Sequence, residues 1–275
     1  MERNPEEIKR AVKERYGNLA KQRGQSCCSP GASSSCCGPN AALESAPAAA
    51  TRLYSEEELE TLPEEVTSMS LGCGNPTALA ELNEGEVVLD LGSGGGIDCF
   101  LAAQKVGARG RAIGLDMTPE MIQLARENAK KMGVSNVEFR LGEMEHMPVS
   151  DNSVNTIISN CVINLSPDKD AVFREAFRVL KPGGKFCVSD IVLLEELPRP
   201  VQESLEQWAG CVAGALKQDA YLDKIKAAGF ARISTVSNPI SLGDESDIPQ
   251  ELRDFATALK GKIASVTVKA FKPKA

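Results

Sequence analysis

The chain has 275 residues, of which 42% are hydrophobic and 25% are charged, an ordinary composition for a globular protein. The formal net charge of −7 argues against a protein that binds nucleic-acid phosphates through a basic surface. The sequence contains neither a long apolar run that would span a membrane nor a secretory signal, so we expect a cytoplasmic protein without membrane association.

The N-terminal part of the sequence predicts a helix followed by a flexible segment. Residues 4–23 carry apolar side chains at helical spacing. Residues 24–50 are rich in Ser, Gly, Pro, Ala and Cys, and contain too few apolar side chains to form a core. Folded structure should resume at Ser55, which together with Glu58 predicts a helix N-cap with a capping box.

From residue 86 onward, short apolar runs alternate with amphipathic segments, which is typical of strand–helix–strand units. The expected strands are 87–92, 110–116, 137–143, 154–160, 185–194, 231–237 and 265–272. The expected helices are 98–107, 118–133, 168–184, 219–230 and 248–261, the third of them closed by a Pro-Gly-Gly sequence. This order predicts an α/β fold, with a doubly wound, Rossmann-like sheet of seven strands flanked by helices.

A glycine-rich loop, Gly92-Ser93-Gly94-Gly95-Gly96, directly follows the first expected strand and precedes a helix. Glycines at such a turn let the backbone approach a ligand closely, and the free N–H groups of the helix can bind an anionic group. The loop does not complete the G-x-G-x-x-G dinucleotide pattern, because position 97 is Ile.

Acidic residues lie at or near the ends of the first three expected strands. They are Asp90, Asp116 and Glu143. Ligands of open α/β sheets bind at this edge, where the carboxylate of Asp116 could accept hydrogen bonds from both hydroxyls of a ribose. Glu143 could accept a hydrogen bond from an adenine amino group. Each acid alone could equally be a solvated loop residue, but the three together favour a nucleoside-binding site.

The chain has nine cysteines, and their odd number without a secretory signal indicates reactive or ligand thiols. Three of them lie in separate segments, Cys73 in SLGCGNP, Cys161 in SNCVINL and Cys211 in WAGCVAGA. Thiolates bind soft centres better than oxygen ligands do. Taken singly, each could also be a small buried hydrophobic residue, which is our interpretation of Cys99 and Cys187.

The segments SLGCGNP, LDLGSGGGIDC, GLDMT, SNCVINL and WAGCVAGAL together resemble the arsenite methyltransferase family of bacterial or archaeal type, within the class I S-adenosylmethionine-dependent methyltransferases. The resemblance spans most of residues 70–216. It implies a methyltransferase domain over 51–275, with a substrate-capping region around 196–225, after an N-terminal part over 1–50. It also implies that the sheet ends in an antiparallel pair, and that the protein transfers methyl groups from S-adenosylmethionine to trivalent arsenic in arsenic detoxification.

The same resemblance implies which residues bind the cofactor. These are Asp90, Gly92, Ser93, Gly94 and Gly96 in and before the loop at the methionine end, Asp116 and Met117 at the ribose and one adenine face, Glu143 and Met144 at the adenine edge, and Asn160 below the sulfonium.

The resemblance further implies that Cys73, Cys161 and Cys211 bind As(III) and displace glutathione or water from it. Methylation would raise arsenic to As(V), and its return to As(III) would leave a protein disulfide. Thioredoxin or glutathione would then reduce that disulfide by thiol–disulfide exchange.

Two other functions remain open at this point. One is an S-adenosylmethionine-dependent methyltransferase that acts on a quinone or another small molecule, and the other is a non-catalytic, thiol-based arsenical-binding protein. His146, the only histidine, is expected at the surface, so the sequence offers no obvious base for the first alternative. The pairs Cys27-Cys28 and Cys36-Cys37 could capture arsenite or could be incidental thiols.

Overall fold

The computed structural model describes residues 4–23, 53–67, 74–198, 201, 211–240 and 257–274. Cys73, the Cys-rich segment 24–50 and residues 248–256 of the last expected helix lie outside the described residues. No helix in the described part is long and apolar enough to cross a membrane.

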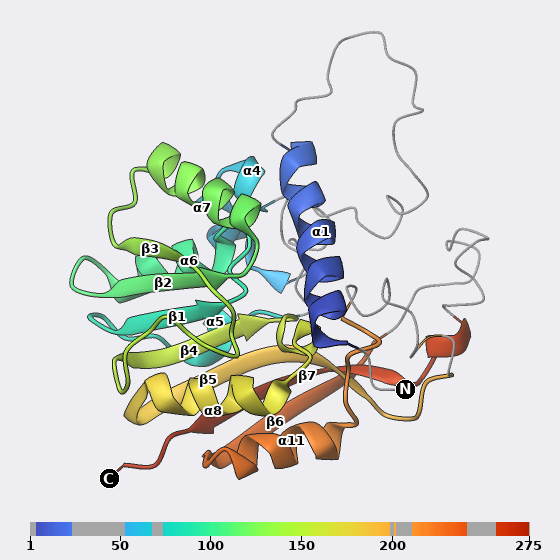
Figure 1. The fold of residues 1–275 in the computed structure, drawn as a ribbon. Coiled ribbons are helices and arrows are strands. Elements are labelled where there is room, and N and C mark those ends of the chain that lie inside the picture. Colours follow the sequence, from blue (N-terminus) through green and yellow to red (C-terminus); the bar gives the residue numbers. More distant parts are fainter. Residues whose placement is uncertain are drawn as a thin grey trace, which may run out of the picture.

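A seven-stranded sheet forms the centre of the fold, in the order β3-β2-β1-β4-β5-β7-β6 (Figure 1). Its strands are β1 Val87–Leu91, β2 Arg111–Asp116, β3 Val137–Leu141, β4 Val154–Asn160, β5 Leu180–Leu193, β6 Ala231–Pro239 and β7 Ile263–Phe271. Strands β1 to β5 pair in parallel, whereas β7 is antiparallel to both β5 and β6. The structure confirms the predicted doubly wound α/β sheet and its antiparallel end.

Helices flank the sheet and connect most of its strands. They are α1 Pro5–Arg23, α3 Glu56–Glu60, α4 Glu64–Thr67, α5 Pro76–Ala80, α6 Ile97–Val106, α7 Pro119–Met132, the 3-10 turn η2 Ile163–Leu165, α8 Lys169–Val179 and α11 Gln218–Ala227. The predicted capping box is confirmed, because the Ser55 hydroxyl accepts a hydrogen bond from the Glu58 N–H and the Glu58 carboxylate accepts one from the Ser55 N–H.

The predicted end of one helix is wrong. Helix α8 ends at Val179, not at the Pro-Gly-Gly sequence, because Leu180 already has extended backbone angles of φ −69° and ψ 138°. Leu180 pairs with Val154 of β4, so the Pro-Gly-Gly sequence lies inside the long strand β5. Pairing with β4 therefore places in a strand the residues that local sequence signals assign to a helix.

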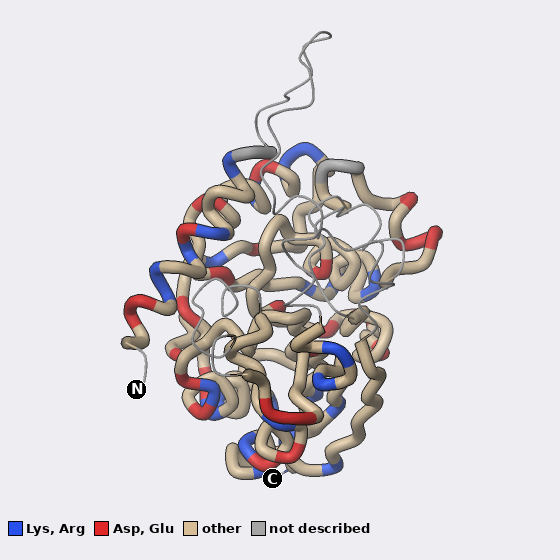
Figure 2. The backbone as a smooth tube through the Cα atoms, turned by 90° about the vertical axis from the view of Figure 1, so that its right-hand side faces the viewer, with Lys and Arg blue, Asp and Glu red and all other residues tan. Residues whose placement is uncertain are grey.

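Aliphatic and aromatic side chains fill both faces of the sheet. On one face, Phe173 of α8 makes edge-to-face contacts with Phe186 of β5 and Tyr221 of α11. On the other, Phe100 of α6 contacts Phe139 of β3 in the same geometry. Figure 2 shows Lys and Arg interspersed with Asp and Glu along the described backbone, as expected for an ordinary solvated surface.

Truncation of Phe173 should destabilise the fold strongly. The side chain is fully buried at 0% exposure, and Phe173→Ala removes both aromatic contacts and leaves a cavity. We expect a loss of about 3–5 kcal/mol in the free energy of unfolding, measured by urea denaturation. His146→Ala, at an exposed position, is the control, and an equal loss in the two variants would contradict this description of the core.

Candidate functional site

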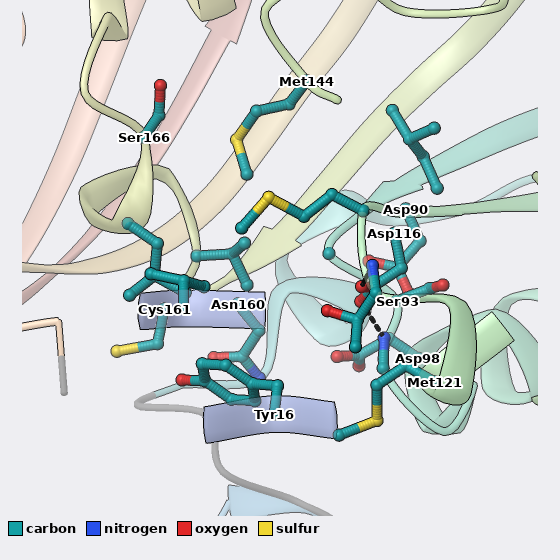
Figure 3. Close-up of a pocket in the computed structure, with 18 of the residues that line it drawn as sticks. Tyr16, Asp90, Ser93, Asp98, Asp116, Met121, Met144, Asn160, Cys161 and Ser166 are labelled. Atoms are coloured by element: carbon teal, nitrogen blue, oxygen red, sulfur yellow. Dashed lines mark hydrogen bonds between the residues drawn. The ribbon is translucent and has the colours of Figure 1, made fainter. Parts of the chain in front are cut away.

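A pocket lies at the edge of the sheet where the parallel strands end, and α1 lies beside this edge (Figure 1). Lys9, Val12 and Tyr16 of α1 line it, together with Tyr54 and Asp98. The predicted cofactor and substrate residues that line it are Asp90, Gly92, Ser93, Gly94, Asp116, Met117, Met144, Asn160 and Cys161 (Figure 3).

The glycine loop contains one tightly packed glycine and one glycine that is open to a ligand. Gly92 has φ +69°, and a Cβ there would lie 2.3 Å from a methyl group of Val162. Gly94 has φ +51°, but a Cβ there would meet nothing within 4 Å in the described structure. The hydroxyl of Ser93 is buried and has no hydrogen-bond partner among the described residues. The loop thus leaves space and an unused polar atom for a ligand.

Asp116 is fixed to this loop from the end of β2. One of its carboxylate oxygens accepts a hydrogen bond from the Gly94 N–H at 3.0 Å, and the other accepts one from the Thr118 N–H at 2.8 Å. Burial raises the pKa of Asp116, and these donors offset part of that rise. The carboxylate is therefore held in one orientation toward the pocket.

Asp98 and Tyr54 are pocket residues that the sequence reasoning missed. The Tyr54 hydroxyl lies 3.1 Å and 3.2 Å from the two carboxylate oxygens of Asp98. Burial raises the pKa of Asp98 to about 6, despite the hydrogen bonds of Tyr54 and Asn160. Burial and the nearby charge of Asp98 also raise the pKa of Asp90 well above its usual value. The sequence shows an acidic residue, Asp98, in the first turn of the expected helix. It does not show that the side chain of Asp98 lines the pocket.

Asn160, the last residue of β4, connects the pocket to the segment that contains Cys73. Its amide donates hydrogen bonds to the Gly74 carbonyl at 2.7 Å and to the Tyr54 hydroxyl at 3.2 Å, and its oxygen accepts one from the Gly74 N–H. Gly74 directly follows Cys73 in the chain. The backbone next to Cys73 is thus held at the pocket.

Glu143 faces helix α1. Its carboxylate oxygens lie 2.6 Å from the Lys9 ammonium and 3.1 Å from the Lys13 ammonium. The hydrogen bond from Lys9 holds the pKa of Glu143 below its ordinary value. Met144 and Met117 line the pocket of the described structure, whereas Glu143 does not. Its predicted contact with adenine stays a prediction.

Cys161 and Cys211 lie together in one buried cluster. Cys161 follows the last residue of β4 and lines the pocket, and the Cys211 thiol donates a hydrogen bond to the Cys161 carbonyl at 2.7 Å. Both residues have left-handed backbone angles, with φ +61° and +67° respectively. Non-glycine residues rarely adopt this conformation, and those that do often lie at functional sites. Cys99 and Cys187 are buried in the core, as predicted.

Comparison with known proteins identifies the class of protein. Residues 82–229 match a family model described as a methyltransferase domain. The chain is 44% identical over 274 residues to the arsenite methyltransferase of Halobacterium salinarum, covering 99% of this chain and 68% of that protein. It is 38% identical over 216 residues to the arsenite methyltransferase of Aquipseudomonas alcaligenes, covering 76% of this chain and 60% of that protein.

A solved structure agrees with these matches. The crystal structure of CrArsM, an arsenic(III) S-adenosylmethionine methyltransferase from Chlamydomonas reinhardtii, is 35% identical, with a TM-score of 0.66. The match covers 80% of this chain and 73% of that chain. The fold and the family model thus define a methyltransferase whose methyl donor is S-adenosylmethionine. Within that class, the chain belongs to the arsenite methyltransferase family. It spans about 55–68% of the length of curated relatives from mouse, Aquipseudomonas and Halobacterium.

The polar and acidic groups of the pocket suit this cofactor. The open side of Gly94 and the unpaired Ser93 hydroxyl can receive its methionine end. S-adenosylmethionine carries a sulfonium and an ammonium group, and the buried carboxyl groups of Asp90, Asp98 and Asp116 provide the opposite charge. These acids therefore become better ionised when the cofactor binds.

Cofactor affinity should fall in acid because Asp98 must be ionised to attract the cationic cofactor. Its pKa of about 6 predicts that Asp98 adds no pH dependence to the affinity well above this pH. Below it, affinity falls about tenfold per pH unit, since the neutral carboxyl must first lose its proton. Calorimetric titration of S-adenosylhomocysteine, which has the ammonium but no sulfonium, at pH 5 to 8 measures this dependence.

Asp98→Asn provides the matched control for that titration. The variant should bind more weakly above pH 7 and should show a shallower pH dependence, with Asp90 and Asp116 responsible for what remains. An unchanged affinity and pH profile in Asp98→Asn would contradict the role of Asp98.

Proposed function

We propose that this chain methylates arsenite, with the arsenic held by the thiols of Cys161 and Cys211. The observation that carries the proposal is that the two cysteines meet in one buried cluster beside the donor pocket. Each has the left-handed backbone that is rare outside glycine and common at functional sites. Membership of the arsenite methyltransferase family supports the same substrate.

The thiols explain how the chain can select arsenite. Soft thiolate sulfurs bind trivalent arsenic better than oxygen ligands do. When arsenite binds, each thiol gives its proton to one arsenic-bound hydroxyl, which leaves as water while an arsenic–sulfur bond forms. Two such exchanges leave one coordination position, which Cys73 would fill, in agreement with Gly74 being held at the pocket. Trivalent arsenic keeps its lone pair as the nucleophile.

The pocket proposed for the methyl donor lies next to the two thiols, because Cys161 lines it and Cys211 contacts Cys161. S-adenosylmethionine supplies an electrophilic methyl group on a sulfonium centre. Asp116 and the loop around Gly94 would hold the nucleoside and methionine ends, and Asn160 and Cys161 line the same pocket. The methyl transfer requires no general base, because the attacking lone pair of arsenic carries no proton that must be removed.

A reductant would complete each catalytic cycle. Thioredoxin or glutathione would reduce the disulfide that forms when methylated As(V) returns to As(III). Residues 196–225 would cap the substrate, in agreement with Cys211 contacting the loop after β4. Residues 1–50 would form the N-terminal part of the enzyme, whose helix α1 lines the donor pocket.

Replacement of either thiol should abolish methyl transfer to arsenic. We expect Cys161→Ser and Cys211→Ser to reduce the transfer of radiolabelled methyl to arsenite to background in the presence of thioredoxin or glutathione, because serine oxygen binds arsenic poorly. Cys187→Ala, which removes a buried thiol of the core, should keep the activity.

The same assay distinguishes the small-molecule alternative. Relatives named demethylmenaquinone methyltransferase are 33% identical, but only over 112 residues, or 41% of this chain. A methyltransferase for such a substrate should tolerate both serine variants. If the wild-type chain binds S-adenosylmethionine but transfers no methyl group to arsenite, the arsenic proposal is wrong.

A further inference from the structure

Helix α1 lines the donor pocket, although it lies outside residues 82–229 that match the methyltransferase domain. Lys9, Val12 and Tyr16 occupy positions i, i+3 and i+7, and therefore share the face of the helix that lines the pocket. Figure 1 shows α1 beside the edge where the parallel strands end. The methyl donor would therefore bind between this helix and the glycine loop.

Apolar packing holds one side of α1 without fixing the helix along its axis. Ile8 and Val12 are each 2% exposed and pack in the same cluster as Leu165 of η2. Hydrophobic contacts are not directional, so a helix that packs only through them could slide or turn. Directional contacts would keep the same residues of α1 at the pocket.

Two lysines of α1 provide such contacts by binding one carboxylate. The Lys9 ammonium donates to one oxygen of Glu143 at 2.6 Å, and the Lys13 ammonium donates to the other at 3.1 Å. Lys9 and Lys13 are four residues apart, so they occupy the same face on successive turns of the helix. Glu143 follows β3 directly after Gly142, and it thus fixes two turns of α1 to the edge of the sheet.

We infer that Lys9 and Lys13 are positioning residues for S-adenosylmethionine: by binding Glu143 together, they hold α1 in the place where it encloses the cofactor. The inference concerns the binding of the methyl donor alone, and it does not rest on the arsenic chemistry proposed above. It assigns the N-terminal helix a part in cofactor binding, beyond the glycine loop and the acidic residues at the strand ends.

The charge of Lys9 requires an explanation, because a cation in this pocket would by itself oppose the binding of a cationic cofactor. The buried Glu145 carboxylate lies 3.8 Å from the Lys9 ammonium, in addition to Glu143, and accepts a hydrogen bond from the Ser166 hydroxyl at 2.6 Å. Burial opposes the charge of Lys9, but the hydrogen bond to Glu143 raises its pKa above the ordinary value. Lys9 is therefore charged and compensated, so it can anchor α1 without strong repulsion of the cofactor.

The other end of α1 lies close to α7. The Lys21 ammonium lies 2.8 Å from one carboxylate oxygen of Glu120, and a Cβ at Gly17 would lie 3.2 Å from the other. The side chain of Lys21 is 64% exposed, whereas that of Lys9 is 14% exposed. Since exposed ion pairs contribute little, we expect the pair of Lys9 with Glu143 to contribute most to the placement of the helix.

Replacement of both lysines by methionine removes their charges and keeps an unbranched apolar side chain. For Lys9→Met/Lys13→Met we expect the dissociation constant for S-adenosylhomocysteine to rise about three- to tenfold, between the effect of an exposed ion pair and that of a hydrogen bond to a charged group. Calorimetric titration measures this change. If Lys9 only repelled the ligand, the double variant would bind equally or more tightly, and that result overturns the inference. Lys224→Met, which removes an ion pair with Asp170 that does not line the pocket, is the control and should bind like the wild type.

Two further measurements separate the positioning of α1 from other effects of the lysines. Hydrogen–deuterium exchange on the full chain should be faster at the amides of α1 in the double variant than in the wild type, because the contacts with Glu143 are lost. S-Inosylhomocysteine, which lacks the adenine amino group, should lose affinity by the same factor as S-adenosylhomocysteine. Unchanged exchange in α1 overturns the inference. A loss confined to S-adenosylhomocysteine also overturns it, because the lysines would then act by orienting Glu143 toward the amino group. None of these outcomes depends on methyl transfer to arsenite.

Discussion

Burial of carboxyl groups at the edge where the parallel strands end is the constraint on which the site depends. Asp90, Asp98, Asp116 and Asp190 are buried there or on the adjoining strand β5, and burial raises the pKa of each. A buried charge destabilises a fold unless donors or an opposite charge compensate for it. The fold provides backbone N–H groups and tyrosine hydroxyls, and a cationic cofactor provides the rest. Burial of these carboxyl groups therefore destabilises the protein without its cofactor. The same burial favours the binding of S-adenosylmethionine.

Helix α1 contacts both the donor pocket and the pair of thiols, Cys161 and Cys211. Its lysines pair with Glu143 beyond the end of β3, while its apolar stripe and Tyr16 cover the loop after β4. The donor pocket and the thiol pair thus share one wall. Helix α1 is thus positioned to affect the binding of both the cofactor and the proposed arsenic substrate.

The sequence could predict the features that depend on local order along the chain. The alternation of elements placed Asp116 and Asn160 at strand ends and Cys161 directly after one, where the structure has them. It could not predict contacts between distant segments. The stripe of α1 indicated a buried face but not its partner, and no local spacing relates Lys9 to Glu143, 134 residues away. The end of α8 was missed for the same reason, since pairing with β4 decides it.

In the proposed mechanism, the thiols of Cys161 and Cys211 bind arsenic next to the pocket for the methyl donor. Arsenic K-edge X-ray absorption on the full chain with arsenite and S-adenosylhomocysteine tests it most directly. We expect sulfur neighbours around arsenic in the wild type, and fewer of them when Cys161 and Cys211 are replaced by serine. An arsenic shell made only of oxygen, or one that the double replacement leaves unchanged, would contradict it.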